Sequence, residues 1–135
     1  MTDKKTLRVG VIGAGRIGKI HAETLATRIP GAEVACIVDV NPAAAKELAE
    51  KLHVEKHGTE YKMIMEDKSI DAVAICSSTD THSMLIIEAA KAGKHIFCEK
   101  PVDYDLKRIA AAIDAVKKAG VKCQIGFNRR FDSNF

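Results

Sequence analysis

The sequence has no tryptophan, only two tyrosines and four phenylalanines, and no long apolar run. None of its apolar stretches approaches the ~20 residues that a membrane-spanning helix needs. Residues 1–5 are polar and lack the apolar segment of a secretion signal. These absences predict a cytoplasmic protein that has no membrane as partner.

An excess of charge of one sign is absent as well. Lysine and arginine number 21 against 18 aspartates and glutamates, and the net charge is +3. The basic residues are scattered among acidic ones, whereas a protein that binds nucleic acid ordinarily carries a basic stripe. We therefore expect no nucleic acid as partner.

The sequence also lacks any C-x-x-C pair. Each of its four cysteines falls within or at the end of an apolar, strand-like run: Cys36, Cys76, Cys98 and Cys123. Buried free thiols in a reducing compartment explain this placement better than a disulfide or a metal site. We expect no metal.

With 135 residues, 47% of them hydrophobic, the chain is long enough for one domain with its own core. Short, continuously apolar runs alternate with helical stretches, which is typical of parallel strands covered on both faces. Right-handed crossovers between such strands predict an α/β fold, a doubly wound parallel sheet in strand order 3-2-1-4-5-6. We expect strands at 7–12, 33–38, 54–57, 71–75, 95–98 and 121–125. We expect helices at 16–28, 42–52, 81–92 and 105–119.

Several helix ends carry their own signals. Asn41 followed by Pro42 is typical of an N-cap and a first helical position. Gly93 and Gly120 each follow a predicted helix and are suited to end it.

A glycine-rich segment follows the first predicted strand and opens the first predicted helix. Its first glycine permits a tight turn, the second lets the backbone approach a pyrophosphate, and the third lets helix and strand pack closely. Free N–H groups at the helix start would hold the phosphates. This context favours a Rossmann dinucleotide site over a glycine-rich turn without a ligand. The residues are Gly13, Ala14, Gly15, Arg16, Ile17 and Gly18.

Asp39 ends the second predicted strand, about 20 residues after Gly18. A carboxylate at this place accepts hydrogen bonds from the ribose hydroxyls and repels a 2′-phosphate. Residues 40–45 contain no arginine or lysine that could receive such a phosphate. The sequence therefore predicts NAD rather than NADP as the cofactor.

Glu99-Lys100-Pro101 follows the fifth predicted strand, and the carboxyl ends of strands line the ligand crevice of an open α/β sheet. At such a place Lys100 can lose solvent, which suits it to proton transfer, and Glu99 can orient its ammonium group. Pro101 restricts the backbone that follows. We predict that Lys100 is catalytic and that both Glu99 and Lys100 lie beside the cofactor.

The loop after the fourth predicted strand reaches the same crevice. Ser77, Ser78, Thr79 and His82 are therefore candidates for contacts with the nicotinamide half of the cofactor. The alternative is that Thr79 or Asp80 only caps the next helix.

Other positions leave two interpretations open. His21 shares a helix face with Ile17, Ile20, Thr24 and Leu25, so a satisfied core histidine competes with a ligand contact. Near the end of the chain Asn128 and Arg129 are candidates for cofactor contacts. For Arg129 and its neighbour Arg130 the alternative is a solvated basic turn.

Together these motifs resemble the N-terminal domain of the glucose–fructose oxidoreductase and inositol dehydrogenase (Gfo/Idh/MocA) family. The resemblance extends over essentially the whole chain, and the segment 127–135 is most similar to myo-inositol 2-dehydrogenases. It rests on the glycine segment with His21-Ala22, on Thr79-Asp80-Thr81-His82, on Glu99-Lys100-Pro101, and on Gly126-Phe127-Asn128-Arg129-Arg130-Phe131-Asp132.

The resemblance implies that Lys100 binds the substrate hydroxyl or assists its deprotonation. It also implies a second domain, an open antiparallel sheet that shapes the sugar pocket, carries a histidine as the main acid and base, and usually forms the oligomer interface. Residues 1–126 would then be the dinucleotide-binding domain, and residues 127–135 the start of the connection to the second domain.

We therefore expect the NAD-binding domain of a homo-oligomeric, NAD-dependent oxidoreductase that transfers hydride from a polyol or sugar hydroxyl to NAD. The chain alone would bind NAD(H) without turnover. The alternative is a non-catalytic NAD(H)-binding sensor or assembly module, which would have no use for Glu99 and Lys100.

Overall fold

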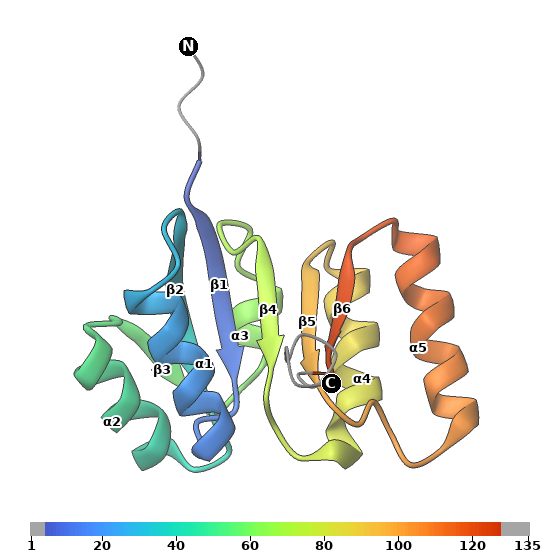
Figure 1. Ribbon diagram of the computed structural model, residues 1–135, viewed down its shortest axis with the longest axis horizontal. Coiled ribbons are helices and arrows are strands. Elements are labelled where there is room, and N and C mark those ends of the chain that lie inside the picture. The colour runs from blue at the N-terminus through green and yellow to red at the C-terminus, as the bar shows by residue number, and fades with distance from the viewer. Residues whose placement is uncertain (1–4, 128–135) are drawn as a thin grey trace, which may run out of the picture.

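The computed structural model describes residues 5–127 and contains a six-stranded parallel sheet (Figure 1). Its order is β3-β2-β1-β4-β5-β6, so the predicted order is confirmed. The strands are β1 (Leu7–Ile12), β2 (Ala32–Val38), β3 (Lys56–Gly58), β4 (Ala72–Ile75), β5 (His95–Glu99) and β6 (Cys123–Gly126). The helices are α1 (Arg16–Thr27), α2 (Pro42–Leu52), α3 (Lys62–Met65), α4 (Thr79–Lys91) and α5 (Leu106–Ala119).

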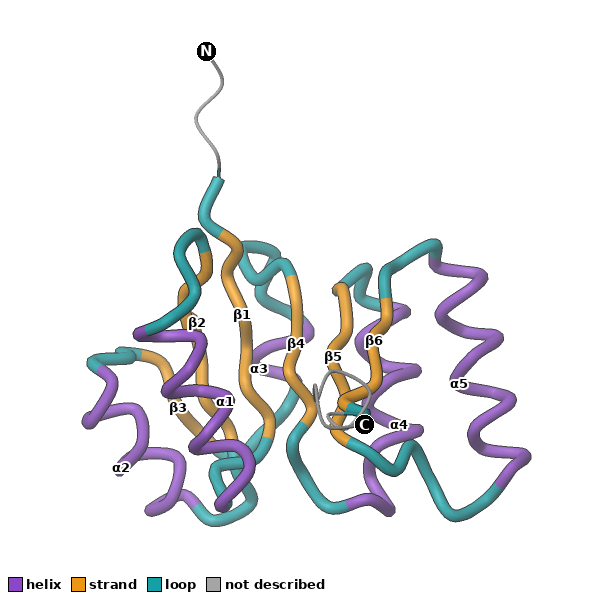
Figure 2. Tube along the Cα trace, viewed as in Figure 1, coloured by secondary structure: helices purple, strands orange, loops and turns teal. Residues whose placement is uncertain are grey.

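Helices lie on both faces of the sheet (Figure 2), and each face has its own hydrophobic core. On one face Ala22 of α1 and Leu48 of α2 pack with Val11 and Ile37 of the sheet. On the other face α3, α4 and α5 cover Ile75 and its neighbours. Side chains of a central strand point alternately to the two faces, which explains why β4 and residues 9–12 of β1 carry no polar side chain.

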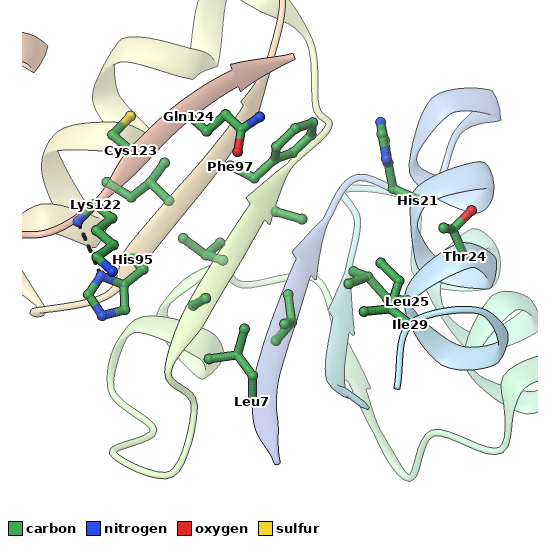
Figure 3. A pocket seen from close by; sticks show the side chains of 15 residues that line it. Leu7, His21, Thr24, Leu25, Ile29, His95, Phe97, Lys122, Cys123 and Gln124 are labelled. Atoms are coloured by element: carbon green, nitrogen blue, oxygen red, sulfur yellow. Dashed lines mark hydrogen bonds between the residues drawn. The ribbon is translucent and has the colours of Figure 1, made fainter. Parts of the chain in front are cut away.

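Among residues 5–127, part of one face of the sheet has no helix packed against it. Here β4, β5 and β6 carry helices on one face only, and an apolar groove of about 510 Å³ runs along the other face beside α1 (Figure 3). Ile17 and Ile20 of α1 are exposed, although their spacing predicted a buried helix face. No described element packs against that side of α1, so the helical periodicity alone could not reveal their exposure.

Most element ends agree with the sequence prediction, and the differences have local causes. The Asn41 and Asp105 side chains accept hydrogen bonds from the first-turn N–H groups of α2 and α5, as N-caps do. The third strand lies at 56–58 instead of 54–57, because residue 53 takes a left-handed conformation that ends α2. The short helix α3 was not predicted, since four residues show no clear helical period.

The cysteines follow the prediction except at two positions, Cys76, which is half-buried, and Cys123. All four are free, and Cys36 and Cys98 are fully buried. Burial raises the pKa of Cys36 to about 11 and those of Cys76 and Cys98 to about 12. Cys123 is exposed, contrary to the prediction, because it lies on the edge strand beside the apolar groove.

The predicted C-terminal limit of the domain lies near the end of the described residues. Phe127 is exposed, and residues 128–135 lie outside the described residues, so the division predicted after residue 126 stays a prediction.

Among residues 5–127, no helix is both long and apolar enough to cross a membrane.

Candidate functional site

The loop between β1 and α1 has the shape that the glycine motif predicted. Gly13 has a φ of +108°, and a Cβ there would lie 2.6 Å from the carbonyl carbon of Cys76. A Cβ on Gly18 would lie 1.8 Å from the carbonyl oxygen of Gly13. A Cβ on Gly15 would meet no atom within 4 Å, so the outer side of this loop is open to a ligand.

The N-terminus of α1 is prepared for an anion. Gly15 is the N-cap and provides no side-chain hydrogen bond, and the first turn holds no acidic residue. The first N–H groups of a helix have no partner within the helix, and the helix dipole adds positive potential there. Arg16 and Ile17, both exposed, begin this turn. The end of α1 can therefore bind phosphate groups through its backbone.

Asp39 lies where β2 ends and is hydrogen-bonded to the glycine loop. Its Oδ2 accepts a hydrogen bond from the N–H of Ala14 at 2.6 Å, and its Oδ1 accepts one from the N–H of Asn41 at 2.8 Å. A carboxylate has about four lone-pair sites, so Asp39 can accept further hydrogen bonds from ligand hydroxyls.

A hollow of about 340 Å³ lies beside Asp39 and brings together three of the predicted site residues, Gly13, Ser77 and Ser78. Sequence reasoning missed several of its lining residues: Val40, Thr59, Tyr61 and Met84. Val40 is 92% exposed and directly follows Asp39 in the sequence. That position was the signal that could have indicated Val40 as a lining residue. Nothing comparable was available for the others, because they come from β3–α3 and α4 and meet only in the folded chain.

The loop after β4 is fixed by hydroxyl groups rather than by the predicted caps. Ser78 is the N-cap of α4 but makes no side-chain cap, and Thr79 and Asp80 already lie in the first turn. Capping by either of those two is therefore wrong. The Thr81 hydroxyl donates to the carbonyl oxygen of Ser78 at 2.6 Å and lies 2.7 Å from the Ser77 hydroxyl.

Glu99 and Lys100 do not pair with each other. Glu99 Oε1 lies 2.5 Å from Nε2 of His21, whose ring meets Phe97 edge-on at a centroid distance of 5.0 Å. The carboxylate thus faces α1, while the side chain of Lys100 is exposed and keeps its solvent. His21 is half-buried and acts as the partner of Glu99, which neither sequence interpretation described.

His82 lies beneath the two loops instead of on their surface. The residue is 1% exposed, its Nδ1 lies 2.7 Å from the carbonyl oxygen of Pro101, and its Nε2 lies 2.9 Å from that of Ser77. Both ring nitrogens are therefore occupied, and the predicted cofactor contact of His82 stays a prediction. Asn128 and Arg129 lie outside the described residues. Within residues 5–127, no group of three histidine, cysteine or acidic side chains is arranged to hold a metal ion.

Comparisons with known proteins identify the family of this chain. The model of an oxidoreductase family with an NAD-binding Rossmann fold (GFO_IDH_MocA) matches residues 7–127. The myo-inositol 2-dehydrogenase of Thermotoga maritima is 50% identical over 129 residues, which are 96% of this chain and 38% of that protein. The scyllo-inositol 2-dehydrogenase (NAD(+)) of Bacillus subtilis is 44% identical over 126 residues, 93% of this chain and 37% of that protein.

A solved structure has the same fold. The scyllo-inositol dehydrogenase of Lactobacillus casei with bound NAD(H) and scyllo-inositol is 37% identical and superposes with a TM-score of 0.91. The superposition covers 96% of this chain and 38% of that protein. The chain thus spans well under half the length of the relatives it matches.

Proposed function

The chain belongs to the oxidoreductase family with an NAD-binding Rossmann fold, and on that premise we propose that it is the cofactor-binding domain of an NAD-dependent dehydrogenase. The observation that carries the proposal is the open glycine loop hydrogen-bonded to a carboxylate at the end of β2. These residues fit a dinucleotide: the backbone at Gly15 is free for a pyrophosphate, and Asp39 suits the two ribose hydroxyls.

The substrate class follows from the relatives. The proteins compared above are named as inositol dehydrogenases, so we propose a polyol or a related sugar as substrate of the complete enzyme. NAD, when bound, supplies the hydride acceptor for the carbon that bears the hydroxyl. A homo-oligomeric state and a cytoplasmic location belong to the same proposal; four free cysteines fit a reducing compartment.

Different residues of this chain have different roles in the proposed function. The start of α1 and the loop before it hold the diphosphate, and Asp39 selects NAD over NADP. Lys100 extends from the end of β5 into solvent, where it can hold a substrate hydroxyl or help to remove its proton. The Glu99 carboxylate contacts His21 and so lies on the side of the β5 end that faces α1.

Calorimetric titration of the 135-residue chain with NAD and NADP tests the cofactor assignment directly. We expect binding of NAD with a clear preference over NADP, and no NADH production with myo-inositol, since positioning by further residues supplies ~7–11 kcal/mol of barrier reduction in such reactions. Equal affinity for the two cofactors contradicts the first expectation. Steady turnover that Lys100→Met abolishes contradicts the second.

The same substitution distinguishes a dehydrogenase from a sensor. In the full-length protein Lys100→Met should abolish polyol oxidation and leave the NAD affinity nearly unchanged, because the glycine loop and Asp39 are untouched. A Lys100→Met variant that oxidises polyols at the parental rate would contradict the catalytic role of Lys100. A full-length parental protein that binds NAD and oxidises no polyol would support the sensor or assembly module instead.

A further inference from the structure

His82 connects two loops that border the candidate site. It stands in the first turns of α4, beneath the Ser77 loop that follows β4, and it also reaches Pro101 in the loop that follows β5. The second loop carries Lys100. No backbone hydrogen bond between these two loops is present among the described residues, so the imidazole is the polar link between them.

The chemistry of this link is unusual. Nδ1 and Nε2 lie 2.7 and 2.9 Å from carbonyl oxygens, both within hydrogen-bond distance. A carbonyl oxygen can only accept, so each nitrogen must bring a proton. A neutral imidazole has one N–H, and only the imidazolium has two. In the neutral form one lone pair would point at a carbonyl oxygen inside a buried site.

We propose that His82 is a positioning residue which, as an imidazolium, clamps the Ser77 loop to the Lys100–Pro101 loop and so sets the spacing of the two loops for the dinucleotide. The inference rests on the proposed function for its ligand, NAD(H). The hydrogen bonds themselves do not depend on it.

The charges around His82 do not oppose this arrangement strongly. Its own helix carries Asp80 and Glu88, and the β5 end carries Glu99 and Lys100. Burial and the positive end of the α4 dipole disfavour a cation here, whereas two charge-assisted hydrogen bonds to carbonyl oxygens favour it.

Asp103, which is buried, is one of two acidic residues on the segment beyond Pro101, and the other, Asp105, caps α5. Its carboxylate accepts hydrogen bonds from the Ser83 hydroxyl and from the N–H of Tyr104, and it pairs with Arg108 at 3.3 Å. Ser83 directly follows His82 in α4. Asp103 therefore links the same loop to the next position along the helix.

The clamp has a predicted pH dependence with a definite sign. Only protonated His82 can donate hydrogen bonds to both loops, so the clamp is complete at lower pH. In the neutral form of His82 one loop is left without its donor. NAD affinity should then fall about two- to tenfold, the effect of one hydrogen bond.

Nitrogen NMR of the 135-residue chain labelled in its histidines, recorded between about pH 5 and 9, reports protonation without a variant. We expect protons on both nitrogens of His82 at the pH of tightest NAD binding. A single neutral tautomer throughout this range would overturn the proposal. Because this measurement uses the parental chain, it remains decisive even if a His82 variant fails to fold.

Calorimetry with NAD over the same range tests the consequence. His82→Gln, which keeps a donor for one carbonyl only, should bind NAD more weakly and lose the affinity change that tracks His82. His53→Asn is the matched control: it removes a histidine from the left-handed end of α2 and should keep the parental profile. Both variants retain His21, so its contribution to the pH profile is the same in each.

The outcomes separate the two proposals. If the parental chain binds no NAD at any pH, the proposed function fails while the NMR result still decides the protonation of His82. If NAD binds and His82→Gln keeps the parental affinity and pH profile, the positioning role fails alone.

Discussion

Asp39 and Ala14 are joined by a 2.6 Å hydrogen bond from the N–H of Ala14 to Oδ2 of Asp39. The residue that we propose to select the cofactor therefore also holds the loop that we propose to receive its phosphates. A change at Asp39 should act on both functions, which a sequence motif alone would not indicate.

Asp39→Ala should weaken NAD binding by roughly 5- to 150-fold and reduce the preference over NADP, because it removes about 1–3 kcal/mol of hydrogen bonding and the repulsion of a 2′-phosphate. Titration calorimetry with both cofactors measures this. Asp105→Ala is a suitable control, since it removes a capping aspartate of α5 and should lower stability without changing cofactor preference. An unchanged preference in Asp39→Ala would contradict the assignment.

Gly15 and Gly18 should respond differently to alanine. Gly15→Ala places its methyl in open space and should keep the melting temperature while it reduces NAD affinity, because the methyl obstructs the approach of the diphosphate. Gly18→Ala forces a Cβ within 1.8 Å of a backbone oxygen and should lower both the melting temperature and the affinity. Thermal unfolding and NAD titration of the two variants check this. Equal losses of stability in both would show that the loop is not open at Gly15.

Asp67 should make the domain sensitive to acid. The Ser69 hydroxyl and then the Lys56 ammonium hold the pKa of this carboxyl well below its ordinary value of 3.8. A carboxyl whose pKa is lower in the folded state stabilises the fold fully above its unfolded pKa, and that contribution is lost as the pH falls below about 4. The melting temperature of the parental chain should therefore fall more steeply between about pH 5 and 3 than that of Asp67→Asn. Asp114→Asn, which alters an exposed pair, should follow the parental curve.

Thiol modification should distinguish Cys123 from the other cysteines. Burial raises the pKa of all four thiols, but Cys123 is exposed, so the reagent reaches it most readily. Ellman's reagent should modify one thiol of the native chain and four in denaturant. Cys123→Ser should remove the fast reaction. A fast reaction that persists in this variant would show that another thiol opens to solvent.

The sequence by itself determined the fold class, the strand order and the position of the glycine loop. Continuous apolar runs, capping residues such as Asn41 and Asp105, and the close approach required at Gly18 are local properties, and they act through the nearest few residues. Right-handed crossovers then leave few ways to order the strands.

Only the tertiary structure decided where the site side chains face. Glu99 meets His21, which lies 78 positions away in the chain, and His82 finds its two acceptors on different loops. Such contacts depend on how α1 and α4 lie against the sheet, and no local pattern records that placement. The same holds for the exposed Ile17 and Ile20, because the period of a helix shows which residues share a face but not what covers it.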